Sequence, residues 1–141
     1  MISKEEVLNT IEKWQKAVDA GDIDGVVALY HPEKGVLLGT MDTEKTGGRI
    51  GAERIKDYFK HFLGGRRRVE AHFPPEEKAQ IEIMGSRGLY AGYYQFTLYE
   101  NDGSVRKANA KFTYIMEKDG NNQPLIIHHN SGLTSKGIVG K

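Results

Sequence analysis

Apolar residues follow a helical period near the start of the chain and a strand period in its second half. Over residues 3–20 they recur every three or four positions, which predicts an amphipathic helix. Ser3 and Glu6 have the spacing of a capping box at its start, and Gly21 suits the position just beyond its end. This is the clearest helix of the sequence.

Two further helices are predicted after it. A short one starts after Asp22 or Asp24 and ends before Pro32, because the residue that precedes a proline disfavours helix. A longer one starts near Ala52 and stops at Gly64. The polar stretch 42–48 between them is predicted to be a loop.

The longest strand signal is a hairpin whose arms are residues 89–99 and 106–117. Both arms are rich in aromatic and β-branched residues, and Asn101-Asp102-Gly103 supplies a turn between them. Strands of this length usually bend, and Gly92 gives the first arm a place to do so. Shorter strands are predicted at residues 35–41, 69–73, 79–84 and 125–131.

This order of elements predicts an α+β fold. About six strands form a curved, cone-shaped antiparallel sheet with a mixed edge, and it wraps around three helices from the N-terminal half. A single domain is expected over residues 1–134, followed by a flexible tail over residues 135–141. The concave side of such a sheet is a natural place for a pocket.

Composition excludes several classes of function. The net charge of +1 gives no global field toward nucleic acid or membranes. The chain has no cysteine, which excludes disulfides, a thiolate nucleophile and Cys-ligated zinc. The first residues lack the apolar core of a signal peptide, so we expect a cytoplasmic protein. Arg66-Arg67-Arg68 is interpreted as a solvated loop end, with an anion-binding patch as the alternative.

Several segments resemble the association domain of calcium/calmodulin-dependent protein kinase II and its stand-alone bacterial relatives. They include Ala20-Gly21-Asp22, Tyr30-His31-Pro32 and the closing run 127–132, which reads Ile-His-His-Asn-Ser-Gly. The resemblance covers about residues 4 to 134. It implies membership of the nuclear transport factor 2-like superfamily, which also contains SnoaL-like cyclases and ketosteroid isomerases. It implies self-association through the sheet, as a homodimer or a larger homo-oligomer, and no kinase activity.

The resemblance also indicates where a pocket would lie. Its pocket arginines correspond to Gln95, Tyr114 and Asn130, so the acidic-ligand pocket of the family is not expected here. Strand alternation adds Tyr93, Phe112 and His128 to the same inward set. The helices would add Trp14, Tyr30, Tyr58 and Phe62. Such a lining suits a small hydrophobic or aromatic ligand. Aromatic residues at these spacings are also typical of an ordinary core, so both interpretations stay open.

Two hypotheses of function follow. In the first, the chain is a non-catalytic oligomerisation or ligand-binding domain, with Tyr94, Phe96 and Leu98 on the convex face against a second subunit. In the second, it is a small cyclase- or isomerase-like enzyme acting on a flat hydrophobic ketone, with His128 or Asp42 as the base. No metal site and no cofactor are expected, because adjacent strand histidines point to opposite faces.

Overall fold

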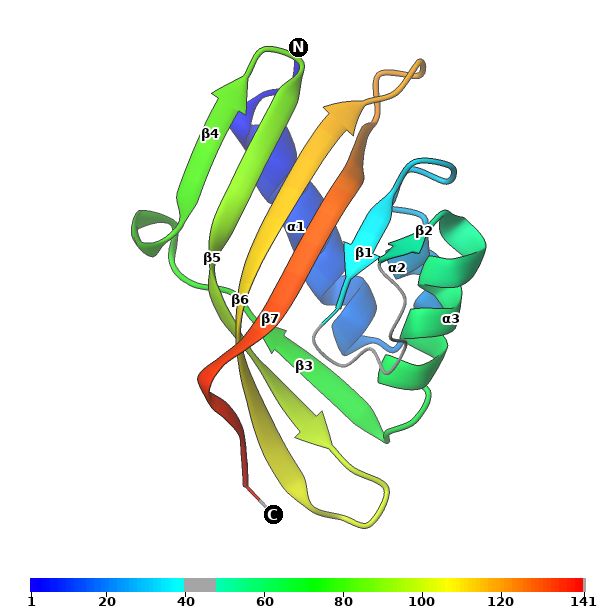
Figure 1. Cartoon of the computed structure of the whole chain (residues 1–141), viewed down its shortest axis with the longest axis vertical. Helices are drawn as coiled ribbons and strands as arrows, with labels where there is room; N and C mark the ends of the chain where they lie inside the picture. The colour runs from blue at the N-terminus through cyan, green and yellow to red at the C-terminus, as the bar shows by residue number, and fades with distance from the viewer. Residues whose placement is uncertain (40–47, 141) are drawn as a thin grey trace.

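The computed structural model describes residues 1–39 and 48–140. Within them, three α-helices lie on one face of a bent seven-stranded sheet (Figure 1). The helices are α1 (Lys4–Asp19), α2 (Ile23–Val27) and α3 (Ala52–Phe62). The strands are β1 (Val36–Leu38), β2 (Arg49–Ile50), β3 (Arg68–His72), β4 (Gln80–Met84), β5 (Arg87–Tyr99), β6 (Val105–Lys118) and β7 (Pro124–Gly140), and a 3₁₀ helix spans Glu76–Lys78. The predicted α+β class is confirmed.

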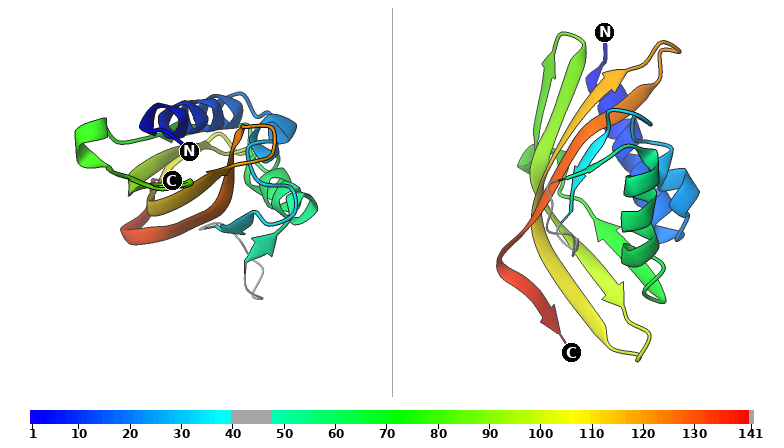
Figure 2. Two further views of the ribbon diagram at one scale, coloured as in Figure 1. Left: turned by 90° about the horizontal axis from the view of Figure 1, so that it is seen from above. Right: turned by 45° about the vertical axis from the view of Figure 1, so that its right-hand side comes forward.

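The sheet has the order β2-β1-β7-β6-β5-β3, and β4 pairs with the other half of β5. Neighbouring strands are antiparallel except for β1, which runs parallel to β7 at His128–Asn130. This parallel pair is the expected mixed edge. The sheet bends around the helices, which all lie on its concave side (Figure 2).

Local signals in the sequence account for the first helix and the long hairpin. The backbone amide of Glu6 donates to Ser3 Oγ at 3.2 Å, and the amide of Ser3 donates to Glu6 Oε1 at 3.0 Å. Gly21 beyond the helix has φ +67°, and Gly103 in the hairpin turn has φ +90°. The predicted capping box, helix stop and turn are therefore confirmed.

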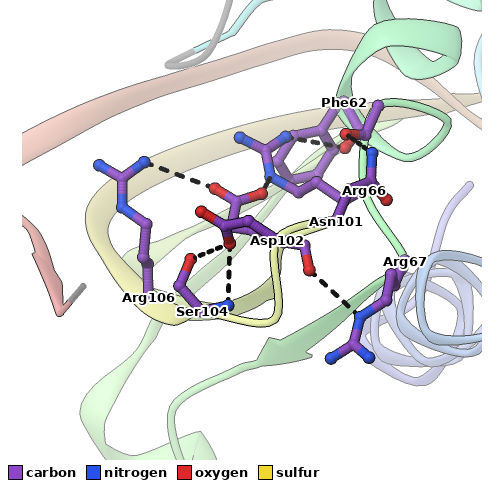
Figure 3. Close-up of polar contacts among 9 residues, drawn as sticks. Phe62, Arg66, Arg67, Asn101, Asp102, Ser104 and Arg106 are labelled. Carbon is purple, nitrogen blue, oxygen red and sulfur yellow. Dashed lines mark hydrogen bonds and ion pairs between the residues drawn. The ribbon is translucent and has the colours of Figure 1, made fainter.

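Arg66 and Arg67 hold the tip of this hairpin against the end of α3, where Arg66 also donates to the Phe62 carbonyl (Figure 3). Arg66 Nε lies 2.8 Å from Glu100 Oε1, and Arg67 Nε donates to the Glu100 carbonyl at 3.1 Å. The guanidinium of Arg68 lies 4.3 Å from the centre of the Tyr99 ring. Arg67 and Arg68 are exposed, as the loop-end interpretation expects, but all three arginines also contact the hairpin.

The end of the last strand was predicted wrongly. β7 runs to Gly140, and Ile138 pairs with Ala108 of β6. Residues 135–140, predicted as a tail, thus form part of the sheet. The register is irregular between Ala108 and Ala110, where β7 bulges at residues 134–137 before it rejoins β6. Because this pairing depends on a distant strand, the Gly- and Lys-rich local sequence gives no sign of it.

The two faces of the sheet differ completely in what covers them. The helix face packs against the helices and carries buried residues of β5 and β6, namely Tyr90, Tyr94, Phe96, Leu98, Ala108, Ala110, Phe112, Tyr114 and Met116. The alternating residues form the open face, on which no helix of the described residues lies; they include Leu89, Ala91, Tyr93, Gln95, Lys111, Thr113 and Ile115. No helix in the described part of the chain is long and apolar enough to span a membrane.

Candidate functional site

The interior of the cone gathers most of the residues that were predicted to line a pocket. These are Trp14, Tyr30, Tyr58, Phe62, Phe112 and Tyr114, and all of them are buried. Trp14 is central, since its ring centre lies 5.9 Å from that of Tyr114 and 5.7 Å from that of His129. This group will be called the aromatic interior.

Four other predicted residues point to the opposite face of the sheet. Gln95 pairs with Asn109, and Asn130 pairs with Thr113, both on the open face. Tyr93 shares the face of Gln95 and is 68% exposed, and His128 shares the face of Asn130. The prediction that these residues face inward is wrong. Directly paired residues share a face, and an error of one residue in the register moves every side chain of a strand to the opposite face.

The same shift affects the residues that were assigned to an association surface. Tyr94, Phe96 and Leu98 were predicted on the convex face, and they are instead buried on the helix face. His129 rather than His128 enters the interior, where it pairs with Tyr114. As predicted, the two adjacent histidines point to opposite faces. However, His129 faces the interior and His128 faces outward, which is the reverse of the prediction.

A chain of hydrogen bonds runs through the aromatic interior. Trp14 Nε1 donates to the Tyr30 hydroxyl at 3.0 Å, and that hydroxyl lies 2.7 Å from His129 Nδ1. His129 Nε2 lies 3.1 Å from the Tyr94 hydroxyl, which donates to Ser131 Oγ at 2.6 Å. The donors and acceptors match along the whole chain only if His129 is neutral with its proton on Nε2.

Burial sets the charge state of this chain. It lowers the pKa of His129 to about 3, with a smaller contribution from nearby His128, and it raises the pKa of Tyr30 and Tyr94. Burial likewise raises the pKa of Tyr114, whose ring stacks on His129 with centroids 4.0 Å apart. All four groups are therefore neutral near pH 7, and both ring nitrogens of His129 are already occupied.

Little empty space remains inside. The cavity between α3 and the helix face has a volume of about 10 Å³. A single water needs about 10–15 Å³, so the void holds one water at most. The aromatic interior is thus packed as a core, and a ligand could enter only if side chains moved.

Within the described residues, the interior holds no carboxylate, the group that isomerase-like chemistry uses as its base. Among the described residues, the buried polar or charged side chains are Thr10, Arg49, Thr97 and His129. None is a carboxylate, and His128, the predicted base, lies on the open face. Asp42, the other predicted base, lies outside the described residues.

Another cleft lies outside the aromatic interior, and the described residues that line it form no convergent set of groups. It has a volume of about 660 Å³ and lies between α1, α2 and the turn that joins β6 to β7. The Glu6 and Asp24 carboxylates on its rim already pair with Lys118 and Lys56. This cleft therefore suggests no chemistry.

The open face carries regular rows of residues across four strands. One row consists of Val36, His128, Ile115 and Leu89, and the next of Leu38, Asn130, Thr113 and Ala91. A third row, Gly132, Lys111 and Tyr93, lies beside a hollow of about 140 Å³ whose lining includes Gly132, Lys111 and Asn130. Beyond Tyr93, a trough of about 450 Å³ separates β5 from the bulge of β7.

Sequence reasoning missed His129, Tyr94 and Ser131 as interior residues. A signal for them was present on β5, where polar Gln95 and Thr97 alternate with apolar Tyr94, Phe96 and Leu98. On β7 the alternation is hidden, because an irregular register between Ile115 and Met116 shifts the faces of residues 128–133 relative to Ile126.

Comparison with known proteins identifies the family of this chain. The sequence model of the calcium/calmodulin dependent protein kinase II association domain matches residues 3–134. The chain belongs to this family. No curated protein matches it.

Solved structures agree with the assignment. A protein from Xanthomonas campestris, described as a candidate member of the same association domain, has 28% identity and a TM-score of 0.81 over 96% of this chain and 91% of its own. A nuclear transport factor 2-like superfamily protein from Salmonella enterica has 15% identity and a TM-score of 0.81 over 94% and 91%. A candidate scytalone dehydratase from Novosphingobium aromaticivorans has 9% identity and a TM-score of 0.80 over 97% and 86%. The last two likenesses show the fold alone.

Proposed function

We propose that this association-domain protein is a non-catalytic domain that binds further copies of itself through the open face of its sheet. One observation carries the proposal: the interior is filled, whereas the sheet face opposite the helices is left uncovered. A site for chemistry would need space inside the cone, and a site for assembly needs only an uncovered, complementary face.

The composition of the open face supports a second copy as the partner. Ile115 and Leu89 are paired neighbours on this face, and Val36 continues their row on β1 beyond His128. These side chains are only partly buried in the single chain, so a covering surface would remove more apolar area from water. Two residues along β6 from Ile115, the Glu117 carboxylate is already paired with Lys34 and Arg87.

The family name supports the same conclusion, since it denotes an association domain. The enzyme names among the structural neighbours belong to chains of low identity, and this fold hosts many unrelated functions. Binding of a small hydrophobic or aromatic ligand by the aromatic interior stays a prediction, and it requires the rings to move apart.

The proposal is tested by the mass of the protein in solution. By light scattering at micromolar concentration, we expect the wild type to exceed the single-chain mass of 15.8 kDa at least about twofold, the smallest closed assembly. Ile115→Lys places a charge on the open face between Leu89 and His128, and it should return the mass to that of one chain. The matched control is Ile83→Lys, at a residue on β4 that is 39% exposed and that shares the helix face of its partner Gly88.

Two results would contradict the proposal. A wild type that stays monomeric at high micromolar concentration excludes self-association as its function. Dissociation by Ile83→Lys but not by Ile115→Lys would assign assembly to another surface.

A further inference from the structure

Tyr93 is the most exposed aromatic side chain on the open face. Its residue is 68% exposed, whereas every other large aromatic residue of β5 and β6 is at least partly buried. A tyrosine ring offers a large apolar area at low entropic cost and therefore gains much from a partner surface. Within the described chain, the face it stands on offers no such partner.

The third row of the open face pairs this projection with a recess. Tyr93 on β5, Lys111 on β6 and Gly132 on β7 lie side by side in the register. Gly132 has no side chain, and a Cβ built there would meet only Lys111 Cε, at 3.9 Å. The hollow of about 140 Å³ therefore lies two strands from the projecting ring.

The ring and the hollow of one copy are placed so that they can meet the hollow and the ring of a second copy. When two copies of a sheet face each other across a two-fold axis that runs along β6, β5 of each copy lies opposite β7 of the other. A residue keeps its position along the strand in this operation. Tyr93 of one copy then lies opposite Gly132 of its partner, and the reverse contact follows by symmetry.

The chemistry of the hollow matches a tyrosine. Asn130 and Thr113 line it and offer an amide and a hydroxyl to the phenol group, which needs a hydrogen-bond partner when it is buried. Lys111 lies beside it, and its ammonium group can rest on the face of the incoming ring. Of the ion pairs within the described residues, none includes Lys111.

We infer that Tyr93 of each copy inserts into the hollow over Gly132 of a second copy and is the residue that fixes the register of assembly. The inference rests on the proposed association through the open face. It adds the residues that meet and the axis that relates them.

Three variants test the contact by sedimentation velocity over a dilution series. Tyr93→Ala removes the ring, and we expect the dissociation constant to rise about thirtyfold, as for a central aromatic anchor. Tyr93→Phe keeps the ring and loses only the hydroxyl, so the rise should be smaller. Gly132→Leu fills the hollow and should weaken assembly to the same extent as Tyr93→Ala.

A fourth variant exchanges the two partners. In the double variant Tyr93→Ala with Gly132→Tyr, the ring projects from β7 and the recess lies on β5, so the same two-fold axis again brings ring and recess together. We expect it to recover at least about tenfold of the affinity lost in Tyr93→Ala, because the two changes act on one contact. A merely structural role of either residue would make the double variant the weakest of all.

The outcomes separate this inference from the proposed function. If Ile115→Lys dissociates the assembly while Tyr93→Ala and Gly132→Leu leave its dissociation constant unchanged, the open face is the interface and the contact inferred here is wrong. Unchanged constants would also result if the ring instead closes the neighbouring trough over a small molecule, and they would overturn the inference in the same way. A monomeric wild type would contradict both.

Discussion

At the scale of single residues, His129 shows how a titratable group is held neutral inside a core. Each of its ring nitrogens has a tyrosine hydroxyl as partner, and the ring stacks on Tyr114. Protonation would force both nitrogens to donate, and the Tyr30 hydroxyl, which already accepts from Trp14, would lose the acceptor of its own proton. The neutral form is therefore favoured by hydrogen bonding as well as by burial.

This arrangement predicts how stability depends on pH. The pKa of His129 is about 3 in the folded chain, against an ordinary value of 6.5, so between these values the unfolded chain binds the extra proton. The free energy of unfolding should therefore fall as pH decreases below 6.5, by about 2 kcal/mol at pH 5. Urea unfolding at pH 7 and pH 5 measures this loss.

The control for this prediction is His129→Gln, which keeps hydrogen-bonding groups but does not titrate. Carboxylates such as Glu117, whose pKa is lowered by hydrogen bonds from Lys34 and Arg87, lose their contribution only at lower pH. Between pH 7 and pH 5 the slope should therefore nearly vanish in the variant. An unchanged slope would mean that another group causes the loss.

The hydrogen-bond chain itself can be tested at Tyr94. Tyr94→Phe removes the acceptor of His129 and the donor to Ser131, which should cost about 1–3 kcal/mol of unfolding free energy. Tyr90→Phe is the matched control, because Tyr90 is buried on the same face and its hydroxyl makes none of the hydrogen bonds found among the described residues. Equal costs would show that the chain is energetically unimportant.

At the scale of elements, the sequence predicted what local signals determine and failed where partners are distant. The capping box at Ser3 and the turn at Gly103 are encoded within a few residues, so α1 and the hairpin were placed correctly. The facing of Gln95 and Asn130 depends on a register across three strands, and a shift of one residue reverses it. Hence six of the ten predicted pocket residues lie in the interior, and the other four lie on the open face.

The last element gives a direct test of strand against tail. Ile138 packs on the core opposite Ala108, whereas its neighbour Val139 is 48% exposed. Ile138→Ala should cost about 1–2 kcal/mol of unfolding free energy, and Val139→Ala close to nothing. If residues 135–140 were a free tail, neither substitution would change the free energy of unfolding measured with urea.

At the scale of the whole molecule, a filled interior and an uncovered sheet face both favour association of the open face with a second copy. The three helices cover only the concave side of the sheet, because all of them lie there. The opposite side keeps apolar residues such as Ile115 and Leu89, and the projecting ring of Tyr93 lies two rows from them on the same face. A copy related by a two-fold axis can cover this side with the same surface, which closes the assembly without leaving a free interface.

Assembly of this kind should make thermal stability depend on protein concentration. If folded chains associate through the open face and unfolded chains do not, mass action raises the apparent Tm as the concentration increases. Between about 1 and 100 µM the wild type should therefore gain several degrees, whereas Ile115→Lys should melt at one temperature throughout. Differential scanning calorimetry measures both. If the Tm of the wild type stays constant over this range and its mass remains that of one chain, the open face is exposed to solvent and no second copy covers it.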